Sequence, residues 1–297
     1  MKKVYRLNNS DTFFYIIVGI IIGILFLVTA YPMLLVLSSS FSSRQAVLGG
    51  KVILWPVDFG LDGYKAVFRY PDILIGYRNT LIYTILGTTL NALVTMIAAY
   101  PLARKGWYGR KAVTFIFIFT MFFSGGMIPT YIQIRSLGIL NTIWAMILPG
   151  ALSVYNMIIA RTFIDSTIPK ELFESAKIDG SSEFRCFWSI VLPLSKAIIA
   201  VLILYYAVGH WNAYFNAFLY LSKKDLFPLQ LFLREILIQN QFNSDIITDP
   251  EMAQQLLGLQ DTLKFSIIVV STAPLMCLYP FAQKHFVKGI MIGSLKG

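Results

Sequence analysis

The stretch Glu171–Lys196, ELFESAKIDGSSEFRCFWSIVLPLSK, interrupts a very apolar sequence with charged side chains and one glycine. Pro169 suits the first turn of a helix, with Thr167 or Ile168 as its cap. We expect this helix to run for about 11 residues and to end at Gly180, which adopts the left-handed cap conformation without strain. The stretch therefore predicts a short helix followed by a sharp turn.

A second, amphipathic helix is expected after the turn. Ser181 or Ser182 can cap it, and Pro193 should end it, because proline disrupts the interior of a helix. An ordinary connection between helices needs only a few residues. Two helices joined at a glycine suggest either a rigid knob for a cytoplasmic partner or an anchor on a membrane surface. The apolar face of the second helix would contain Phe184, Phe187, Trp188 and Val191.

The composition of the chain is that of a membrane protein. Apolar residues make up 57% and charged residues 13%, and the mean hydropathy is +0.67, whereas soluble domains are roughly 25% charged. A nucleic-acid-binding protein would need a soluble basic face, which is not compatible with these runs of apolar sequence despite the net charge of +10. We therefore expect an all-α membrane protein and no nucleic-acid partner.

Six apolar runs are long enough to cross roughly 30 Å of hydrocarbon. They predict transmembrane helices at residues 13–37, 80–103, 112–131, 142–164, 194–221 and 263–283. The segments between and around them are a short N-terminus (1–12), an outer segment (38–79), an inner loop (165–193), an outer loop (222–262) and a C-terminus (284–297).

The positions of lysine and arginine predict the orientation. The short connection RKGWYGRK, residues 104–111, contains four basic residues, and both termini and the inner loop contain more. Because cytoplasmic loops are enriched in lysine and arginine, we expect both termini, this connection and residues 165–193 to lie in the cytoplasm. Segments 38–79 and 222–262 would then be extracytoplasmic.

The sequence has none of the common motifs for catalysis or for a cofactor. It lacks a glycine-rich nucleotide loop, a zinc-protease helix motif, a Cys-x-x-Cys pair and a nucleophile elbow. We therefore expect no catalytic residues, no bound metal and no cofactor in this chain. Any chemical energy that drives it must come from another protein.

Residues 174–193, ESAKIDGSSEFRCFWSIVLP, resemble the EAA loop of MalG-like permease subunits from carbohydrate-uptake ABC importers. Similar flanking stretches include GMIPTYIQIRSLGILNTIWAMILPG and the terminal FVKGIMIGSLKG. Ser175 departs from the pattern, because alanine is usual there. The matching positions are Glu174, Ala176, Asp179, Gly180 and Pro193.

This resemblance implies a type I ABC importer permease in a bacterial cell membrane. It further implies a second homologous permease, two ATPase subunits that bind ATP and Mg²⁺, an extracytoplasmic solute-binding protein and an oligosaccharide substrate, moved by alternating access. In such permeases the EAA loop couples the spans to the ATPase, although its aromatic residues could instead pack against the permease itself. The coupling residues implied are Glu174, Ser175, Ala176, Asp179, Gly180, Phe184, Phe187 and Trp188.

The fifth predicted span contains LYYAVGHWNAYFNAF, in which aromatic and amide side chains recur at helical spacing. Aromatic rings stack on sugars and amides exchange hydrogen bonds with hydroxyls, so these residues are candidates for the substrate path. They could equally bind neighbouring helices or form an aromatic belt at the membrane interface. The candidates are Tyr206, His210, Trp211, Asn212, Tyr214 and Asn216, with Tyr155 and Asn156 from the fourth span.

The long outer loop, residues 222–262, is polar and is typical of a functional segment. By analogy with the related permeases we assign docking of the binding protein to its amide cluster of Gln239, Asn240, Gln241 and Asn243.

An ion-coupled secondary transporter or a channel is the alternative function. Ionisable residues within the spans would favour it, and His210 is the main example.

Overall fold

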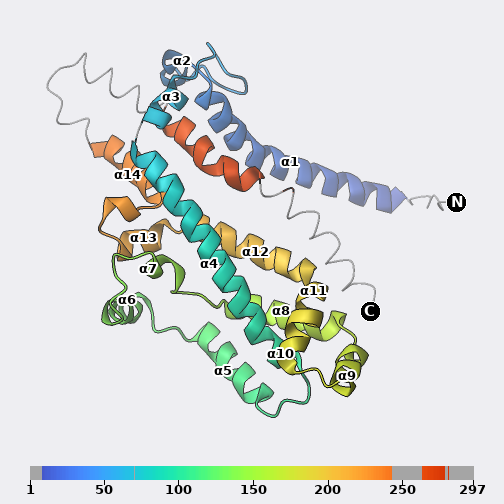
Figure 1. The fold of residues 1–297 in the computed structure, drawn as a ribbon. Coiled ribbons are helices and arrows are strands. Elements are labelled where there is room, and N and C mark those ends of the chain that lie inside the picture. The colour runs from blue at the N-terminus through green and yellow to red at the C-terminus, as the bar shows by residue number, and fades with distance from the viewer. Residues whose placement is uncertain (1–8, 70, 243–262, 278–279, 281–297) are drawn as a thin grey trace. The chain divides into compact units, whose positions relative to one another are not determined.

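The computed structural model describes residues 9–69, 71–242, 263–277 and 280, and it contains no β-strand within them. The expected all-α fold class is confirmed. The helices are α1 (Asn9–Ser40), α2 (Arg44–Leu48), α3 (Asp62–Arg69), α4 (Pro71–Ala103), α5 (Arg110–Phe122), α6 (Met127–Ser136), α7 (Trp144–Ile147), α8 (Val154–Thr167), α9 (Lys170–Ile178), α10 (Glu183–Cys186), η1 (Phe187–Val191), α11 (Leu192–Leu194), α12 (Lys196–Trp211), α13 (Tyr214–Tyr220), η2 (Lys224–Leu226), α14 (Leu229–Phe242) and an unlabelled helix at Leu263–Cys277 (Figure 1).

The chain divides into two compact units. The first comprises residues 1–70 and 236–271, and the second comprises residues 71–235 and 272–297. In the first unit, α1 exposes large apolar side chains along most of its length, which is typical of a membrane-facing helix. The serines at its end bind the segment that follows: Ser38 donates to the carbonyl of Leu54 at 2.6 Å, and the hydroxyls of Ser40 and Tyr64 lie 2.8 Å apart.

The core of the second unit forms around α4, which packs against α8 and α12 (Figure 1). These helices contribute small and flexible apolar side chains, which allow the backbones to approach closely. Aromatic residues of the inner loop extend the same core towards the end of α4. Its most buried members include Met96, Ala99, Leu102, Met157, Ala160, Ile164 and Leu202.

Among the described residues, two helices are long and apolar enough to cross a membrane, and these are α1 and α4. Two bent pairs of helices also qualify if each pair is counted as one span: α5 with α6, bent by 112°, and the helix Glu183–Leu194 with α12, bent by 81°. The helix Leu263–Cys277 is apolar but shorter. α4 begins at Pro71, nine positions before the predicted start at residue 80, because Pro71 and Asp72 favour the first turn of a helix.

Three of the predicted spans are not continuous helices in the structure. Residues 112–131 divide between α5 and α6 at a segment that contains the Gly125–Gly126 pair. Residues 142–164 divide between α7 and α8 around Pro149, which cannot continue a helix without loss of a hydrogen bond. Residues 194–221 divide between α12 and α13 at Asn212–Ala213.

The second helix of the inner loop also differs from its prediction. It does not end at Pro193 but continues to Leu194, and the break falls at Ser195. The five residues of η1 form a π-helical turn that ends two residues before Pro193. A wider turn relieves the clash between a proline ring and the carbonyl four residues earlier, so the helix can continue.

Candidate functional site

The turn of the EAA loop has the geometry that its glycine predicted. Gly180 has a φ of +70°. Its N–H donates to the carbonyl of Lys177 at 3.1 Å, and the N–H of Ser181 donates to the carbonyl of Ala176 at 2.9 Å. This pair of bonds is a Schellman motif, which ends a helix and requires a left-handed residue. Gly180 as the end of the first helix is therefore confirmed.

The caps of the two short helices differ in part from expectation. α9 is capped by Pro169 and not by Thr167 or Ile168, because these two residues end the preceding helix α8. α9 consequently has 9 residues rather than the expected 11 or so. Ser182 caps α10, and its side chain accepts a hydrogen bond from the N–H of Arg185 at 3.3 Å.

The predicted coupling residues divide into an inward and an outward set. Ala176 and Phe187 are buried within the chain itself, which supports the packing role for this one aromatic residue. Phe184 is 74% exposed and Trp188 45%. Ile178, which sequence reasoning missed, is 87% exposed and lies two residues before the turn. An apolar surface on both sides of Gly180 is suited to contact with a partner. The remaining predicted residues, Glu174, Ser175 and Asp179, are also exposed.

The end of α4 holds both helices of the EAA loop. The hydroxyl of Tyr100 donates to Glu183, and the Arg104 guanidinium lies 3.3 Å from the same carboxylate. The guanidinium also stacks 4.2 Å above the ring of Phe173 on α9. The ring of Tyr100 lies 5.6 Å from that of Phe187 in η1. The loop is therefore fixed to the end of α4 through an ion pair, a cation–π contact and aromatic packing.

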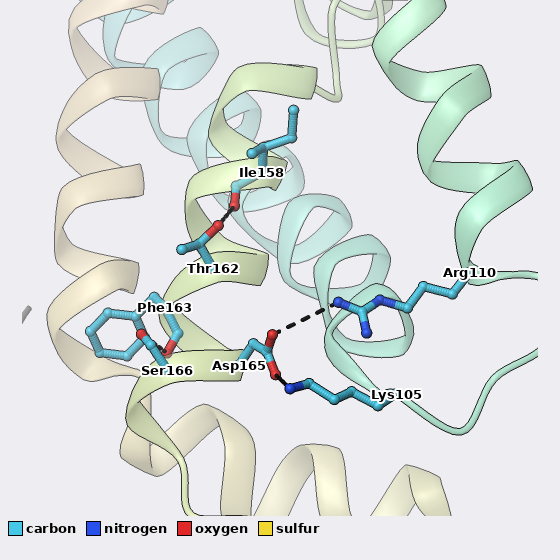
Figure 2. Close-up of polar contacts among 7 residues, drawn as sticks. All are labelled: Lys105, Arg110, Ile158, Thr162, Phe163, Asp165 and Ser166. Carbon is cyan, nitrogen blue, oxygen red and sulfur yellow. Dashed lines mark hydrogen bonds and ion pairs between the residues drawn. The ribbon is translucent and has the colours of Figure 1, made fainter. Parts of the chain in front are cut away.

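A second carboxylate holds the connection between α4 and α5. Figure 2 shows Asp165, near the end of α8, with Lys105 and Arg110 directed towards it. The Lys105 ammonium lies 3.9 Å from one carboxylate oxygen and the Arg110 guanidinium 3.8 Å from the other. These basic residues were interpreted only as a topology signal in the sequence. In the structure they also form ion pairs.

A cavity of about 580 Å³ lies between the α4–α5 connection and α9. Its lining combines basic, acidic and aromatic side chains from both ion-pair clusters. Glu174, the first residue of the EAA pattern, is part of that lining although its side chain is exposed. The lining includes Tyr100, Arg104, Trp107, Asp165, Phe173 and Glu183.

Several of the predicted substrate-path residues pack between helices. Tyr206 is buried, its hydroxyl lies 2.7 Å from that of Thr95, and it also accepts from the N–H of Ser153 at 3.2 Å. Trp211 is 2% exposed, and its ring lies 6.3 Å from that of Tyr77. These contacts support the packing interpretation for Tyr206 and Trp211.

Three of the other predicted path residues are exposed. Asn212 is exposed, and its side-chain oxygen lies 3.5 Å from the amide nitrogen of Gln230. Tyr214 and Tyr155 are exposed, Asn216 is half-buried and Asn156 is buried. The residues are thus not gathered into one pocket, and their role in a substrate path stays a prediction.

The polar face of α4 was missed by the sequence analysis. Small polar side chains recur along it at helical spacing and are buried, and this spacing within an apolar run was the available signal. His210 lies against this face at Gly87. Among the described residues, four buried polar atoms there have no hydrogen-bond partner: Thr84 Oγ1, Thr88 Oγ1, Asn91 Oδ1 and His210 Nε2.

The proposed docking residues fall at the edge of the described chain. Gln239, Asn240 and Gln241 belong to the last turns of α14, but their side chains, like Asn243 as a whole, lie outside the described residues. Across the part of the chain that the structure describes, no group of three or more metal-ligating side chains occurs.

Comparisons with known proteins agree with this architecture. Residues 73–292 match the family described as "Binding-protein-dependent transport system inner membrane component". Protein LplC of Bacillus subtilis (strain 168) is 42% identical over 270 residues, which cover 91% of this chain and 90% of that protein. The polygalacturonan/rhamnogalacturonan transport system permease protein YtcP of the same organism is 40% identical over 271 residues, covering 91% and 94%.

A solved structure is similar along almost the whole chain. It is the crystal structure of a bacterial ABC transporter involved in the import of the acidic polysaccharide alginate, and one of its chains has a TM-score of 0.84 and 32% identity. The match covers 94% of this chain and 99% of that one. The resemblance to sugar-importer permeases is therefore confirmed, and the chain belongs to the family of binding-protein-dependent transport system inner membrane components.

Proposed function

We propose that this chain is a transmembrane permease subunit of an ATP-driven importer for oligosaccharides, including fragments of polysaccharides. Membership of the family makes it a membrane component of a transporter and not an enzyme. Two of the similar proteins are named for the transport of polysaccharides, polygalacturonan or rhamnogalacturonan in one case and alginate in the other. These names support a carbohydrate substrate for this chain.

The observation that carries the proposal is the shape of the EAA loop. α9 and α10 are joined at a left-handed Gly180, and both are fixed to the end of α4. A surface anchor would present its apolar side chains to lipid along one helix. Here Ile178 and Phe184 are exposed on opposite sides of the turn, where a partner groove can receive both.

The proposal includes a membrane topology and a set of partners. The chain crosses the bacterial cell membrane six times with both termini in the cytoplasm, and some of the spans are broken helices. It pairs with a second permease, receives sugar from an extracytoplasmic binding protein and depends on two ATPase subunits for ATP and Mg²⁺. The basic residues at 104–111 and the exposed apolar length of α1 support this arrangement.

The test is to purify the tagged chain in mild detergent with whatever remains bound and to place that complex in proteoliposomes. We expect a second permease and an ATPase to copurify. With the binding protein present, oligogalacturonates or maltooligosaccharides should enter the vesicles only when ATP is supplied. A chain that purifies alone and transports sugar in an ion gradient without ATP would contradict the proposal.

A further inference from the structure

α4 is a single helix of 33 residues, which is about 50 Å at 1.5 Å per residue. The other apolar segments described in its unit are shorter or broken, as the bends of 112° and 81° show. α4 stays one helix through Pro101 near its inner end, so a displacement at one end can be passed along it to the other. The contacts at its two ends therefore determine which parts of the chain α4 can link.

The inner end of α4 is joined to both parts of the EAA loop. Tyr100 in the last turn of α4 and Arg104, which directly follows the helix, both reach the carboxylate of Glu183, the first residue of α10. Arg104 also covers the ring of Phe173 on α9. The Glu183 side chain is 67% exposed, so the ion pair alone would be weak. Two donors at the end of α4 nevertheless fix its direction relative to this helix.

The outer half of α4 is joined to the segment that leads into α14. The side-chain amide of Asn79 donates to the carbonyls of Asp225 and Phe227 at 2.7 and 3.0 Å. The hydroxyl of Tyr83 donates to the carbonyl of Leu226 at 2.7 Å. The hydroxyl of Thr80 accepts from the N–H of Leu229, the first residue of α14, at 2.9 Å.

These outer contacts leave little freedom of movement. Asn79 and Thr80 are buried, and their hydrogen bonds go to backbone groups. α4 therefore fixes the backbone of the segment that leads into α14. Gly76 lies so close that a Cβ there would be 2.9 Å from the Cα of Leu229. The start of α14 must therefore move together with α4.

We propose that Glu183 is a positioning residue that joins the EAA loop to α4, and that α4 carries movement of the loop to the segment 225–229 and the start of α14. This inference rests on the proposed function, because it assumes that the ATPase moves the EAA loop. Glu183 makes no contact with the ATPase in this role. It determines how much of the loop's movement reaches α4.

The experiment measures sugar imported per ATP hydrolysed by the complete complex in proteoliposomes, with the sugar that the wild-type complex imports. Glu183→Ala removes the acceptor for both donors and should lower this ratio by about twofold to fivefold, while the ATPase remains bound. Glu183→Arg places two cations together and should be worse. The double variant Glu183→Arg, Arg104→Glu re-forms the ion pair with reversed charges and should restore part of the ratio.

Asp62→Asn provides the matched control, because it removes an exposed ion pair with Lys65 on α3 in the other unit, and it should leave the ratio unchanged. An unchanged ratio in Glu183→Ala would overturn the inference. So would release of the ATPase by that variant, since Glu183 would then serve docking, or a charge exchange that restores nothing. If the wild-type complex itself shows no ATP-dependent import, the proposed function fails instead.

Discussion

Gly180 sets the angle between α9 and α10 through its backbone alone. No atom lies within 4 Å of the position that a Cβ would occupy there, so a side chain would meet no steric obstacle. The φ of +70° is nevertheless strained for residues other than glycine, least for asparagine and most for β-branched residues. The position therefore separates the effect of backbone conformation from that of packing.

We predict that Gly180→Val lowers ATP-dependent uptake strongly and weakens retention of the ATPase, at a near-normal amount of protein in the membrane. Alanine should cost about 1 kcal/mol at the turn and valine more. Gly180→Asn is the matched control, since asparagine tolerates the left-handed region, and it should retain most of the uptake. The measurement is uptake and ATPase copurification at equal protein level. Equal uptake by the valine and asparagine variants would contradict the left-handed turn as the decisive feature.

Tyr206 allows the packing and substrate-path interpretations to be separated. Tyr206→Phe keeps the ring but leaves the hydroxyl of Thr95 and the N–H of Ser153 without this partner. We predict a loss of about 1–2 kcal/mol of stability, measured as a lower Tm of the detergent-solubilised complex. The exposed Tyr214→Phe should leave Tm unchanged. An unchanged Tm in Tyr206→Phe, together with reduced sugar affinity, would favour the substrate path.

At the scale of helices, the side chain of His210 on α12 packs tightly against α4 at Gly87. A Cβ on this residue would lie 2.3 Å from Nε2 of His210. The imidazole therefore fills the space that a side chain at position 87 would need. Small residues at such crossings allow two membrane helices to pack closely.

We predict that Gly87→Ala destabilises the complex, because the His210 ring must move or the two helices must separate. The double variant Gly87→Ala, His210→Ala should recover much of the loss, because the smaller side chain restores the space. Thermal unfolding of the parent protein, the two single variants and the double variant gives the coupling energy between the two positions. Gly19→Ala on α1, where no atom lies near the added Cβ, should have no such effect. Additive losses in the double variant would show that the two residues do not share this space.

The sequence predicts helices well where the signals are local and poorly where they are not. The first helix of the EAA loop, its glycine stop and the serine cap follow from residues within a few positions of each other. Breaks within apolar runs are harder, because length and hydropathy are the same for straight and broken spans. Pro149 was a local signal for a break within residues 142–164, but the span was predicted from its hydropathy alone.

The site was predicted in part for the same reason. The EAA pattern located the loop, but not which aromatic residues point inwards, because Phe184 and Phe187 both fit an amphipathic face. The carboxylates Glu183 and Asp165 were missed because their partners lie far away in the sequence, as Arg104 does from Glu183. A single sequence contains no direct information on such pairs.

At the scale of the whole molecule, the basic residues have two roles. Those at 104–111 favour a cytoplasmic location, and three of them are also ion-paired with Glu183 or Asp165. Ion pairs of this kind place the connection and the EAA loop on the same side of the membrane. The orientation of the chain therefore determines on which side of the membrane an ATPase can contact the EAA loop.

Labelling of single cysteines in intact cells measures this orientation. Tyr108 is fully exposed in the α4–α5 connection, and Trp55 is 82% exposed in the outer segment between α2 and α3. We predict that an impermeant thiol reagent labels Trp55→Cys in intact cells but labels Tyr108→Cys only after permeabilisation, because cytoplasmic loops are enriched in lysine and arginine. The parent chain, with its native Cys186 and Cys277, measures the background. Labelling of Tyr108→Cys from outside would place the EAA loop on the wrong side for an ATPase and would remove the basis of the six-span topology.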